Sequence, residues 1–334
     1  MIRTRALLVS VVALLAALTL LVAGCESEDE PALADEVGLS MGAGSPGGTY
    51  FPLGVAMADT WRALVDVDVS TQTTGGSVPN LQFLGGGAID VAIAFNDVGV
   101  AAYEGVGLFG GEPTAVESLG NVYPEVVQVI ARADADLETV ADLAGARVSL
   151  GPEESSTALT ARSLLGHAGL DADADLDAVT APFDEAAGSL EAGELDAVVA
   201  IGPPGAQAIE DLAASVDIEL LSVGEEAQEA FVAERPSLSP HYVPAFTYTG
   251  QDDDAETLTY WATLYVAEGF DDDVAYELTR GLYEGEDLIA DTVPVGDEVD
   301  ILNAAKGLGP IPLNEGSERY LDEQGAAEEG DDLE

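Results

Sequence analysis

The sequence is poor in the residue types that many functions require. It has one cysteine, Cys25, one lysine, Lys306, and ten basic residues in total against 63 acidic ones. One cysteine excludes an internal disulfide and a thiolate metal cluster. The net charge of −53 argues against a nucleic-acid partner, because phosphates require a basic surface. The two histidines, His167 and His241, lack metal-ligand partners at useful spacing, so we expect no metal and no cofactor.

The motifs of common enzymes are also missing. The glycines of segment 44–49 are not followed by a lysine, which argues against an ATP-binding loop. No Gly-x-Ser-x-Gly pentapeptide occurs, so the chain lacks the nucleophile elbow of a serine hydrolase. The acidic runs 252–254 and 271–273 lack the spaced loop of an EF-hand and are better explained as solvated loops or helix N-termini. We therefore expect a binding protein that is not an enzyme.

The first 24 residues are predicted to be a signal peptide. Arg3 and Arg5 precede an apolar run over 6–23, which stops at the segment 22–25 (VAGC). This segment resembles a bacterial lipobox, in which the cysteine is lipidated and becomes the first mature residue. The lipid on Cys25 would then anchor the protein to the outer face of the cell membrane. The protein would be extracytoplasmic, or periplasmic. There are two alternatives: a cleaved secretory signal that ends by chance beside a cysteine, and an uncleaved anchor helix.

The excess of acid indicates a salt-rich habitat. Self-repulsion among so many carboxylates weakens a compact state at low ionic strength, whereas at about 1 M salt the Debye length falls to roughly 3 Å. A disordered polyanion is excluded by the 47% hydrophobic content and by regular apolar periodicity. The same screening permits an anionic ligand, because only charged groups within a few ångströms of the site would affect its binding.

Strand-like and helix-like runs alternate between an acidic tether at 25–36 and an acidic tail at 325–334. Apolar runs predict strands at 37–41, 67–71, 89–95, 126–131, 147–150, 197–201 and 261–267. Helical spacing predicts helices at 53–65, 137–143, 157–168 and 273–283. This repeated alternation predicts an α/β fold, and the length suffices for two lobes.

Two glycine-rich turns stand between a predicted strand and a predicted helix, at 44–54 (GSPGGTYFPLG) and 73–80 (TTGGSVPN). Glycine permits close backbone approach, and a following helix offers unpaired N–H groups with partial positive charge. Ligands of open α/β sheets collect outside the carboxyl ends of strands. Both turns are therefore predicted to hold a small ligand, together with the strand ends near 96, 155 and 202.

The predicted ligand contacts are hydroxyl, amide and backbone donors, which can hold a carboxylate without a titrating group. They are Ser45, Gly48, Thr49, Tyr50, Thr74, Gly75, Gly76, Ser77, Asn96, Ser155, Ser156, Thr157 and Gly202. Arg132 is added because a guanidinium can grip a carboxylate in a bidentate pair. Ordinary turn and capping chemistry is the alternative for the neutral residues, and an ion pair with Asp134 is the alternative for Arg132.

These motifs resemble the TAXI-type solute receptors of TRAP transporters. The resemblance covers nearly the whole mature chain and rests on 44–54, 74–77 (TGGS), 148–152 (VSLGP), 157–162 (TALTAR), 311–313 (IPL) and 318–320 (ERY). It implies a two-lobed type II periplasmic-binding-protein fold, with each lobe a mixed sheet flanked by helices and the ligand cleft between the lobes. The implied first lobe comprises 37–131 and 245–324, and the second lobe comprises 132–244.

The resemblance also implies a function. It implies an extracytoplasmic receptor that captures a small carboxylate or amino acid, of the glutamate, glutamine or 2-oxo dicarboxylate class, and delivers it to a TRAP-type membrane permease. The chain departs from the family at Phe51, where a second tyrosine is usual, and at Glu154 and Ser156, where glycines are usual. A lipoprotein that senses a ligand for a membrane histidine kinase is one alternative, and a cell-surface enzyme is another.

Overall fold

The described residues of the computed structural model, 38–46, 48–153 and 155–326, form one mixed sheet with helices on both faces. Its ten strands are β1 (Leu39–Gly44), β2 (Val69–Thr73), β3 (Val91–Phe95), β4 (Val116–Arg132), β5 (Arg147–Ser149), β6 (Asp177–Val179), β7 (Ala197–Gly202), β8 (Ile218–Leu220), β9 (Ser239–Val243) and β10 (Ala255–Ala267). The strand order is β2-β1-β3-β10-β4-β7-β5-β6, with β8 paired to β4 and β9 paired to β10.

The helices fill the connections between strands. The α-helices are α2 (Tyr50–Leu64), α3 (Ser77–Gly85), α4 (Asn96–Glu104), α5 (Ser156–His167), α6 (Phe183–Glu191), α7 (Gln207–Ser215), α8 (Glu225–Glu234), α9 (Asp272–Tyr283), α10 (Glu286–Ala290) and α11 (Glu315–Gln324). Short 3₁₀ helices are η1 (Gly107–Phe109), η2 (Ala133–Ala135), η3 (Val140–Leu143), η4 (Pro294–Glu298) and η5 (Ile301–Asn303).

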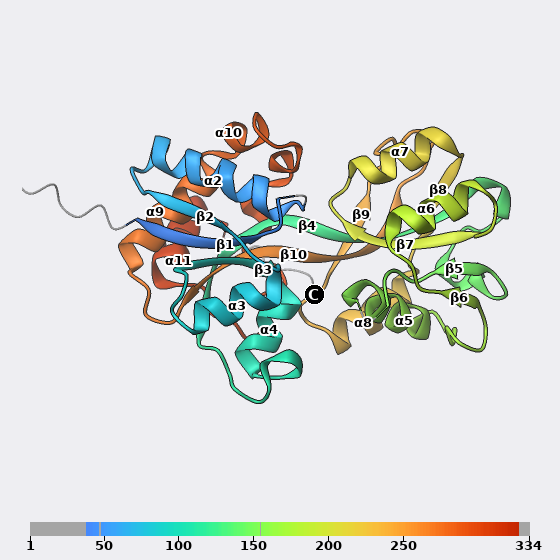
Figure 1. Ribbon diagram of the computed structural model, residues 1–334, viewed down its shortest axis with the longest axis horizontal. Coiled ribbons are helices and arrows are strands. Elements are labelled where there is room, and N and C mark those ends of the chain that lie inside the picture. The colour runs from blue at the N-terminus through green and yellow to red at the C-terminus, as the bar shows by residue number, and fades with distance from the viewer. Residues whose placement is uncertain (1–37, 47, 154, 327–334) are drawn as a thin grey trace, which may run out of the picture. The chain divides into compact units, whose positions relative to one another are not determined.

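Two long antiparallel strands join two parallel groups (Figure 1). The strands β2, β1 and β3 are parallel to one another, and so are β7, β5 and β6. The central pair consists of β4, with 17 residues, and β10, with 13. Antiparallel pairing connects β10 to β3 on one side, and β4 to β7 on the other. Each parallel group therefore presents the carboxyl ends of its strands at one edge of the sheet.

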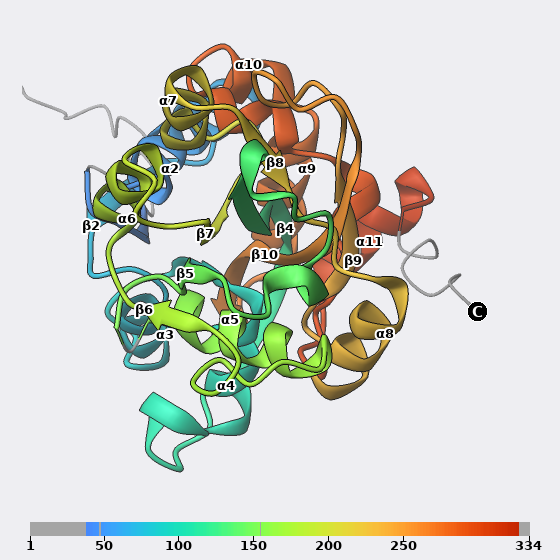
Figure 2. The same cartoon turned by 90° about the vertical axis from the view of Figure 1, so that its right-hand side faces the viewer.

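Four hydrophobic clusters hold the helices on the two faces of the two strand groups. The second half of β4 shows how one strand serves two faces, because Val126 and Ile130 belong to one cluster whereas Val127 and Val129 belong to another. This alternation follows from the two-residue period of a strand. Figure 2 views the β7-β5-β6 group end-on, with α6 and α7 on one face and α5 and α8 on the other.

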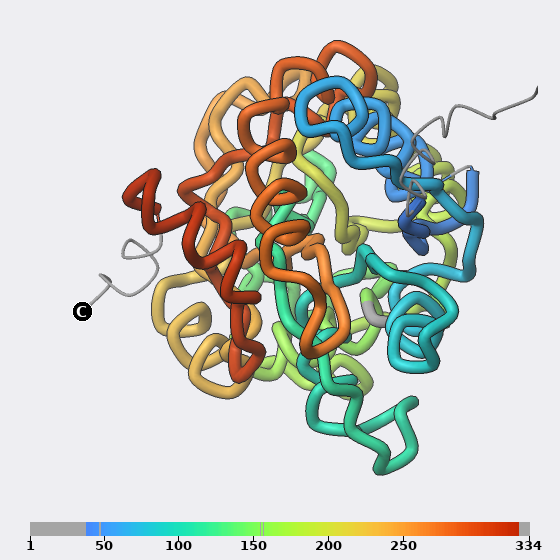
Figure 3. Tube along the Cα trace, turned by 90° about the vertical axis from the view of Figure 1, so that its left-hand side faces the viewer, coloured from blue at the N-terminus to red at the C-terminus, as the bar shows by residue number. Residues whose placement is uncertain are grey.

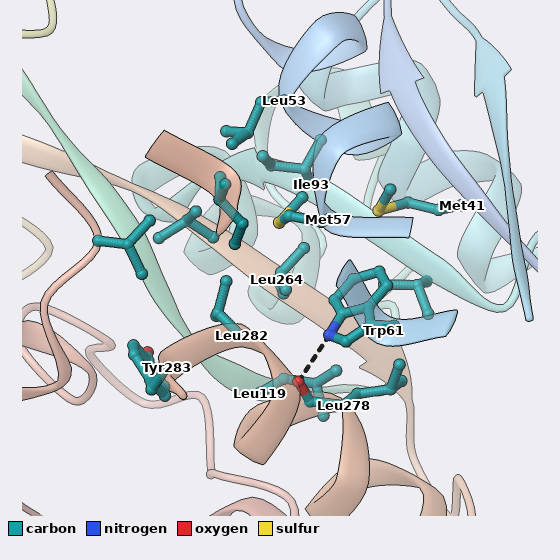
Figure 4. Close-up of a cluster of buried hydrophobic side chains, with 14 of the residues drawn as sticks. Met41, Leu53, Met57, Trp61, Ile93, Leu119, Leu264, Leu278, Leu282 and Tyr283 are labelled. Carbon is teal, nitrogen blue, oxygen red and sulfur yellow. Dashed lines mark hydrogen bonds between the residues drawn. The ribbon is translucent and has the colours of Figure 1, made fainter. Parts of the chain in front are cut away.

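The C-terminal segment returns to pack on the N-terminal strand group. Helices α9 and α10 contact α2, and Figure 3 shows these C-terminal helices beside the N-terminal one. Trp61 of α2 is fully buried, and its indole N–H donates to the Leu278 carbonyl of α9 at 2.8 Å (Figure 4). One core therefore contains residues from both ends of the described chain.

The structure alters several of the predicted elements, and the strand predicted at 261–267 extends back to Ala255. The helix predicted at 137–143 is only η3, which begins with a capping box between Thr139 and Asp142. The strand predicted at 126–131 extends back to Val116. The acidic residue Asp271 caps α9 by accepting the N–H groups of Asp273 and Val274, in agreement with the prediction of a helix N-terminus there.

Several predictions fall on residues outside the described part of the chain. These are the signal peptide at 1–24, the lipidation site Cys25, the tether at 25–36 and most of the tail at 325–334. Within residues 38–326, apart from 47 and 154, no helix has the length and apolar character needed to cross a bilayer.

Candidate ligand-binding site

A pocket of about 280 Å³ lies where β1 and β2 end. Because these strands are parallel, the turns that lead into α2 and α3 meet at the same edge of the sheet. The pocket is lined by Gly44, Ser45, Gly48, Thr49, Tyr50, Thr74, Gly75, Gly76, Tyr123 and Glu125. Seven of the fourteen predicted ligand contacts therefore line a single pocket.

Two helix N-termini face this pocket without side-chain caps. Thr49 precedes α2 and Gly76 precedes α3, and neither helix has a capping hydrogen bond from a side chain at that position. Gly76 adopts φ of 98°, a conformation that favours glycine, and its N–H donates to the Thr74 hydroxyl at 3.2 Å. The first N–H groups of a helix have no partner within the helix and attract anionic groups. This side of the pocket is suited to a carboxylate.

The strand β4 contributes a carboxyl group to the lining of the pocket. Glu125 on β4 is 6% exposed, and its Oε1 accepts a hydrogen bond of 2.5 Å from the Tyr123 hydroxyl. Tyr123 and Glu125 are two residues apart on one strand, so their side chains share a face of the sheet. Burial raises the pKa of Glu125 to about 7, and the hydrogen bond from Tyr123 offsets only part of that rise. The group is therefore poised between its neutral and charged forms near neutral pH.

Tyr50 lies at the centre of an aromatic group that includes Tyr123. Its ring meets those of Phe95 and Tyr123 edge-on, with centroids 5.9 and 6.3 Å away. Its hydroxyl is buried and has no hydrogen-bond partner among the described residues. Burial, followed by the charge of Glu125, raises the pKa of Tyr50 well above its ordinary value. The hydroxyl remains a neutral donor that a ligand could satisfy.

Glu125 also lies at the junction of the two strand groups. The pairing of β4 with β10 extends to Val126, and the pairing of β4 with β7 starts at the same residue, which lies opposite Gly202. Tyr260 of β10 is paired with Glu125 across the sheet. The Tyr260 hydroxyl lies 2.8 Å from that of Thr160 on α5. The pocket of the first group therefore adjoins the strand ends of the second group.

Arg235, the residue after α8, places a cation at this junction beside the second strand group, β7-β5-β6. It donates to the Tyr260 hydroxyl at 3.4 Å and lies over the Phe231 ring at 5.5 Å from its centroid. It also lowers the pKa of Asp97 in part, although burial raises that pKa overall. Arg235 is thus in contact with two aromatic residues and acts electrostatically on Asp97, which lies on α4 of the first strand group.

The remaining predicted residues of the second group lie at its strand ends, outside the pocket. Ser155 caps α5, since its hydroxyl accepts the Ala158 N–H at 3.1 Å and donates to the Pro152 carbonyl at 2.6 Å. Thr157 is half-buried in the first turn of α5, and the carbonyl of Gly202 accepts from Gln128 Nε2 at 3.2 Å. The side chain of Ser156 lies outside the described part of the structure, as does Glu154.

Three other predicted contacts, Ser77, Asn96 and Arg132, have structural partners instead. Ser77 accepts the Phe95 N–H at 3.1 Å. Asn96 is fully buried, donates to the carbonyls of Ser237 and Gly307, and accepts from the Trp261 N–H at 3.1 Å. This side chain has no free donor for a ligand, so we withdraw Asn96 from the site.

We also withdraw Arg132 from the site, because its guanidinium donates to other residues of the chain. Its Nε and Nη2 donate to the two carboxylate oxygens of Asp134, both at 2.8 Å, and its Nη1 donates to the Leu190 carbonyl at 2.9 Å. Arg132 is the last residue of β4, seven positions beyond Glu125. The structure therefore has the ion pair between Arg132 and Asp134 that the sequence analysis gave as the alternative role of Arg132.

The sequence interpretation missed two residues that line the pocket, Tyr123 and Glu125, and two that lie at the adjoining junction, Tyr260 and Arg235. A signal for Glu125 was available, because an acid embedded in the apolar run 122–131 is rarely buried without a role. Tyr123 and Tyr260 carried no such signal, since aromatic residues in strands most often belong to the core.

Larger cavities lie elsewhere but lack the features of this site. One of about 650 Å³ is lined by loop residues around 136–142 and 250–254, many of them acidic, and it contains no predicted contact. In residues 38–326, apart from 47 and 154, no group of histidine, cysteine and acidic side chains could hold a metal ion. We therefore take the smaller pocket, with its convergent donors and buried carboxyl, as the candidate site.

Comparison with known proteins identifies the fold. The sequence model of the NMT1-like family matches residues 41–325. The chain is similar to the structure of a TctC solute-binding protein from Polaromonas, with 15% identity, a TM-score of 0.53, and coverage of 80% of this chain and 90% of that one. It is also similar to the periplasmic aliphatic sulphonate-binding protein SsuA from Escherichia coli, with 15% identity, a TM-score of 0.49 and coverage of 86% and 84%. The predicted α/β fold of the periplasmic-binding-protein type is confirmed.

Proposed function

We propose that this chain, which belongs to the NMT1-like family, is an extracytoplasmic solute-binding receptor for a small carboxylate or amino acid. The observation that carries the proposal is the pocket at the ends of β1 and β2, where two uncapped helix N-termini meet buried hydroxyl groups. Glu125, the one acid among the described pocket residues, is hydrogen-bonded to Tyr123 and not to a serine or threonine hydroxyl. The pocket therefore fits capture and release of a solute better than nucleophilic catalysis.

The partner that we propose is a TRAP-type membrane permease, with the chain as its TAXI-type receptor. The glycine-rich motifs that resemble this family line the pocket at 44–45, 48–50 and 74–76. Lipidation of Cys25 would keep the receptor at the membrane surface. The proposed ligands are glutamate, glutamine and 2-oxo dicarboxylates.

The proposed lobes are 37–131 with 245–324, and 132–244. The first boundary falls at the end of β4 and the second before the start of β10, and we propose these two central strands as the crossover connections between the lobes. We propose that the strand ends of the second lobe, including Thr157 and Gly202, close over the pocket when the ligand binds. Such closure would give the permease a surface that differs between the free and the loaded receptor.

Loss of the Thr49 hydroxyl, which lines the pocket, or of the Thr157 hydroxyl, which the proposed closure would bring over it, should weaken ligand binding. A screen by thermal shift at molar salt, with L-glutamate, L-glutamine and 2-oxoglutarate, should find at least one compound that raises Tm, because a ligand of the native state stabilises it. Thr49→Ala and Thr157→Ala should then each raise the Kd measured by calorimetry about 3- to 10-fold, the value of one hydrogen bond.

Thr292→Ala is the matched control, since Thr292 is exposed at the end of α10 and lines no part of the pocket. Its Kd should equal that of the parent protein. A folded protein whose Tm responds to no compound in a broad screen of carboxylates and amino acids would refute the receptor proposal. Unchanged affinity in both threonine variants would remove the site assignment alone.

Stability should depend strongly on salt if the acidic surface reflects a salt-rich habitat, as we propose. The net charge is −53, and all the arginine-carboxylate pairs involve partly or fully exposed side chains among the described residues. Raising NaCl from about 0.1 M to about 1 M shortens the Debye length from roughly 10 Å to 3 Å, which reduces the repulsion. We expect Tm to rise steadily over this range in scanning calorimetry. A Tm that is constant or falls with added salt would contradict the proposal.

A further inference from the structure

The wall of the pocket formed by Glu125 lacks a counter-charge. Tyr123 donates the one hydrogen bond that the Glu125 carboxyl receives from the described residues, at Oε1. No arginine, lysine or histidine is among the described residues that line the pocket. A carboxylate buried without a cation is costly, and proteins pair such groups or keep them neutral. Arg235, the cation at the junction of the two strand groups, contacts Tyr260 and does not line the pocket, so among the described residues no lining group balances an ionised Glu125 and a bound ligand could do so.

The two walls of the pocket have opposite character. The N–H groups at the starts of α2 and α3 favour a negative group, whereas Glu125 on β4 favours a positive group or a hydrogen-bond donor. Tyr50, whose buried hydroxyl has no hydrogen-bond partner among the described residues, lines the same pocket. A volume of about 280 Å³ suits a small molecule that carries both kinds of group.

We propose that Glu125 is the specificity-determining residue of this pocket, and that it binds the protonated amino group of a zwitterionic amino acid whose carboxylate faces the starts of α2 and α3. Tyr123 is then a positioning residue, because its hydrogen bond fixes one carboxyl oxygen and directs the other to the ligand. The inference rests on the proposed receptor function and narrows its ligand class. It excludes 2-oxo and 2-hydroxy acids, which have the same carboxylates but no ammonium group.

This assignment fixes the direction of the pH dependence. An ammonium group binds the ionised form of Glu125, whose pKa in the free protein is about 7 because of burial. Affinity should therefore fall about tenfold from pH 8 to pH 6 as the carboxyl becomes protonated. If Glu125 instead donated a proton to a ligand carboxylate, affinity would fall as pH rises.

The neighbouring groups should not mask this dependence. Tyr50 on α2, Tyr123 on β4 and Tyr260 on β10 stay neutral, since burial raises the pKa of each. Asp97 on α4 and Arg235 after α8 are the other charged groups at this junction, and the guanidinium lowers the pKa of the buried acid in part. None of these groups contributes to the raised pKa of Glu125, which arises from burial.

The test compares L-amino acids with 2-oxo and 2-hydroxy acids of the same carbon skeleton, by thermal shift and then calorimetry at pH 6 and pH 8. The compounds that bind should be amino acids, with higher affinity at pH 8. Glu125→Gln should weaken their binding about 30-fold or more and abolish the pH dependence. The variant should stay folded, because it removes a buried carboxyl and conserves its shape. Glu219→Gln, on an exposed position of β8, is the matched control and should leave both affinity and pH dependence unchanged.

Tyr123→Phe separates positioning from a structural role. Without its hydrogen bond the pKa of Glu125 should rise, so the midpoint of the affinity profile should move to higher pH, whereas loss of packing alone would lower affinity equally at every pH. Binding of 2-oxo acids as tight as that of the amino acids, or unchanged amino-acid affinity in Glu125→Gln, would overturn the inference and leave the receptor proposal intact. Failure of every compound to bind would overturn both.

Discussion

Replacing Gly316 by alanine should unfold a large fraction of the protein. Gly316 is buried in the first turn of α11, where this helix crosses the start of α9. A Cβ at this position would overlap the carbonyl oxygen of Asp272 and lie 2.7 Å from its carbonyl carbon and 2.9 Å from the Tyr276 nitrogen. All three atoms belong to backbone, so no side chain can rotate away. We expect a loss of at least about 3 kcal/mol in the free energy of unfolding.

The contact between α11 and α9 leaves little room for adjustment. The hydroxyls of Ser317 and Thr279 are 2.7 Å apart and buried between the two helices, and Thr279 also contacts the Leu119 carbonyl of β4 at 3.3 Å. Separating the helices to admit one methyl group would break these hydrogen bonds. Since a domain has only about 5 to 15 kcal/mol of stability, the loss is a large share of the total.

Gly188→Ala is the matched control for this prediction. Gly188 lies on an exposed position of α6, and a Cβ there would meet no atom within 4 Å. Alanine should stabilise the helix by about 0.5 to 1 kcal/mol, because it reduces the freedom of the unfolded chain. Urea unfolding followed by the fluorescence of the two tryptophans would measure both variants. A Gly316→Ala protein as stable as the parent would show that α11 does not pack on α9 as closely as described.

The success of the fold prediction can be traced to strands with simple apolar patterns. The strand β3 is buried along its length, and its sequence (VAIAF) is the continuous apolar run expected of a parallel strand with both faces covered. The first half of β4 was missed because polar residues interrupt its pattern. Asn121, for example, is buried but donates to the carbonyls of Asn303 and Lys306, which lie about 180 residues later in the chain. A sequence pattern does not reveal such distant partners.

The same reason explains why some residues of the site were predicted from the sequence and others were missed. The turns at 44–50 and 74–76 were predicted because their glycines and hydroxyls lie next to each other in the sequence. Glu125 and Tyr123 join these turns only through the pairing of β4 with β10 and of β10 with β3, which no local pattern encodes. Asn96 was assigned to the ligand because its position after a strand is typical of binding residues, whereas its partners are backbone groups far along the chain.

Asn96→Asp should be nearly as damaging as Gly316→Ala. The substitution keeps the size of the side chain and the acceptor for the Trp261 N–H, but it replaces an amide donor to two carbonyls, those of Ser237 and Gly307, by a carboxylate oxygen. The position is fully buried, so two unsatisfied carbonyls would face an unpaired charge. We expect a loss of about 3 to 5 kcal/mol at neutral pH.

The loss should shrink in acid, and this provides a test of its cause. Burial and the two carbonyls raise the pKa of the introduced carboxyl in the folded state above its unfolded value of about 3.9. The folded variant therefore binds the proton more tightly, so the protonated form is stabilised at low pH and that stabilisation is lost as pH rises through the folded pKa. The difference in unfolding free energy between the parent and the variant should be smaller at pH 5 than at pH 8 in urea titrations.

Asn303→Asp makes the same chemical change where a carboxylate can be accommodated. The Oδ1 of Asn303 accepts from the Lys306 ammonium at 2.8 Å, and a charged oxygen would strengthen that contact. Its stability should stay within about 0.5 kcal/mol of the parent. If Asn96→Asp were equally mild, Asn96 would not be the link between α4, the segment before β9 and the turn at Gly307. Its amide would then be free for a ligand, and the assignment made from the sequence would return.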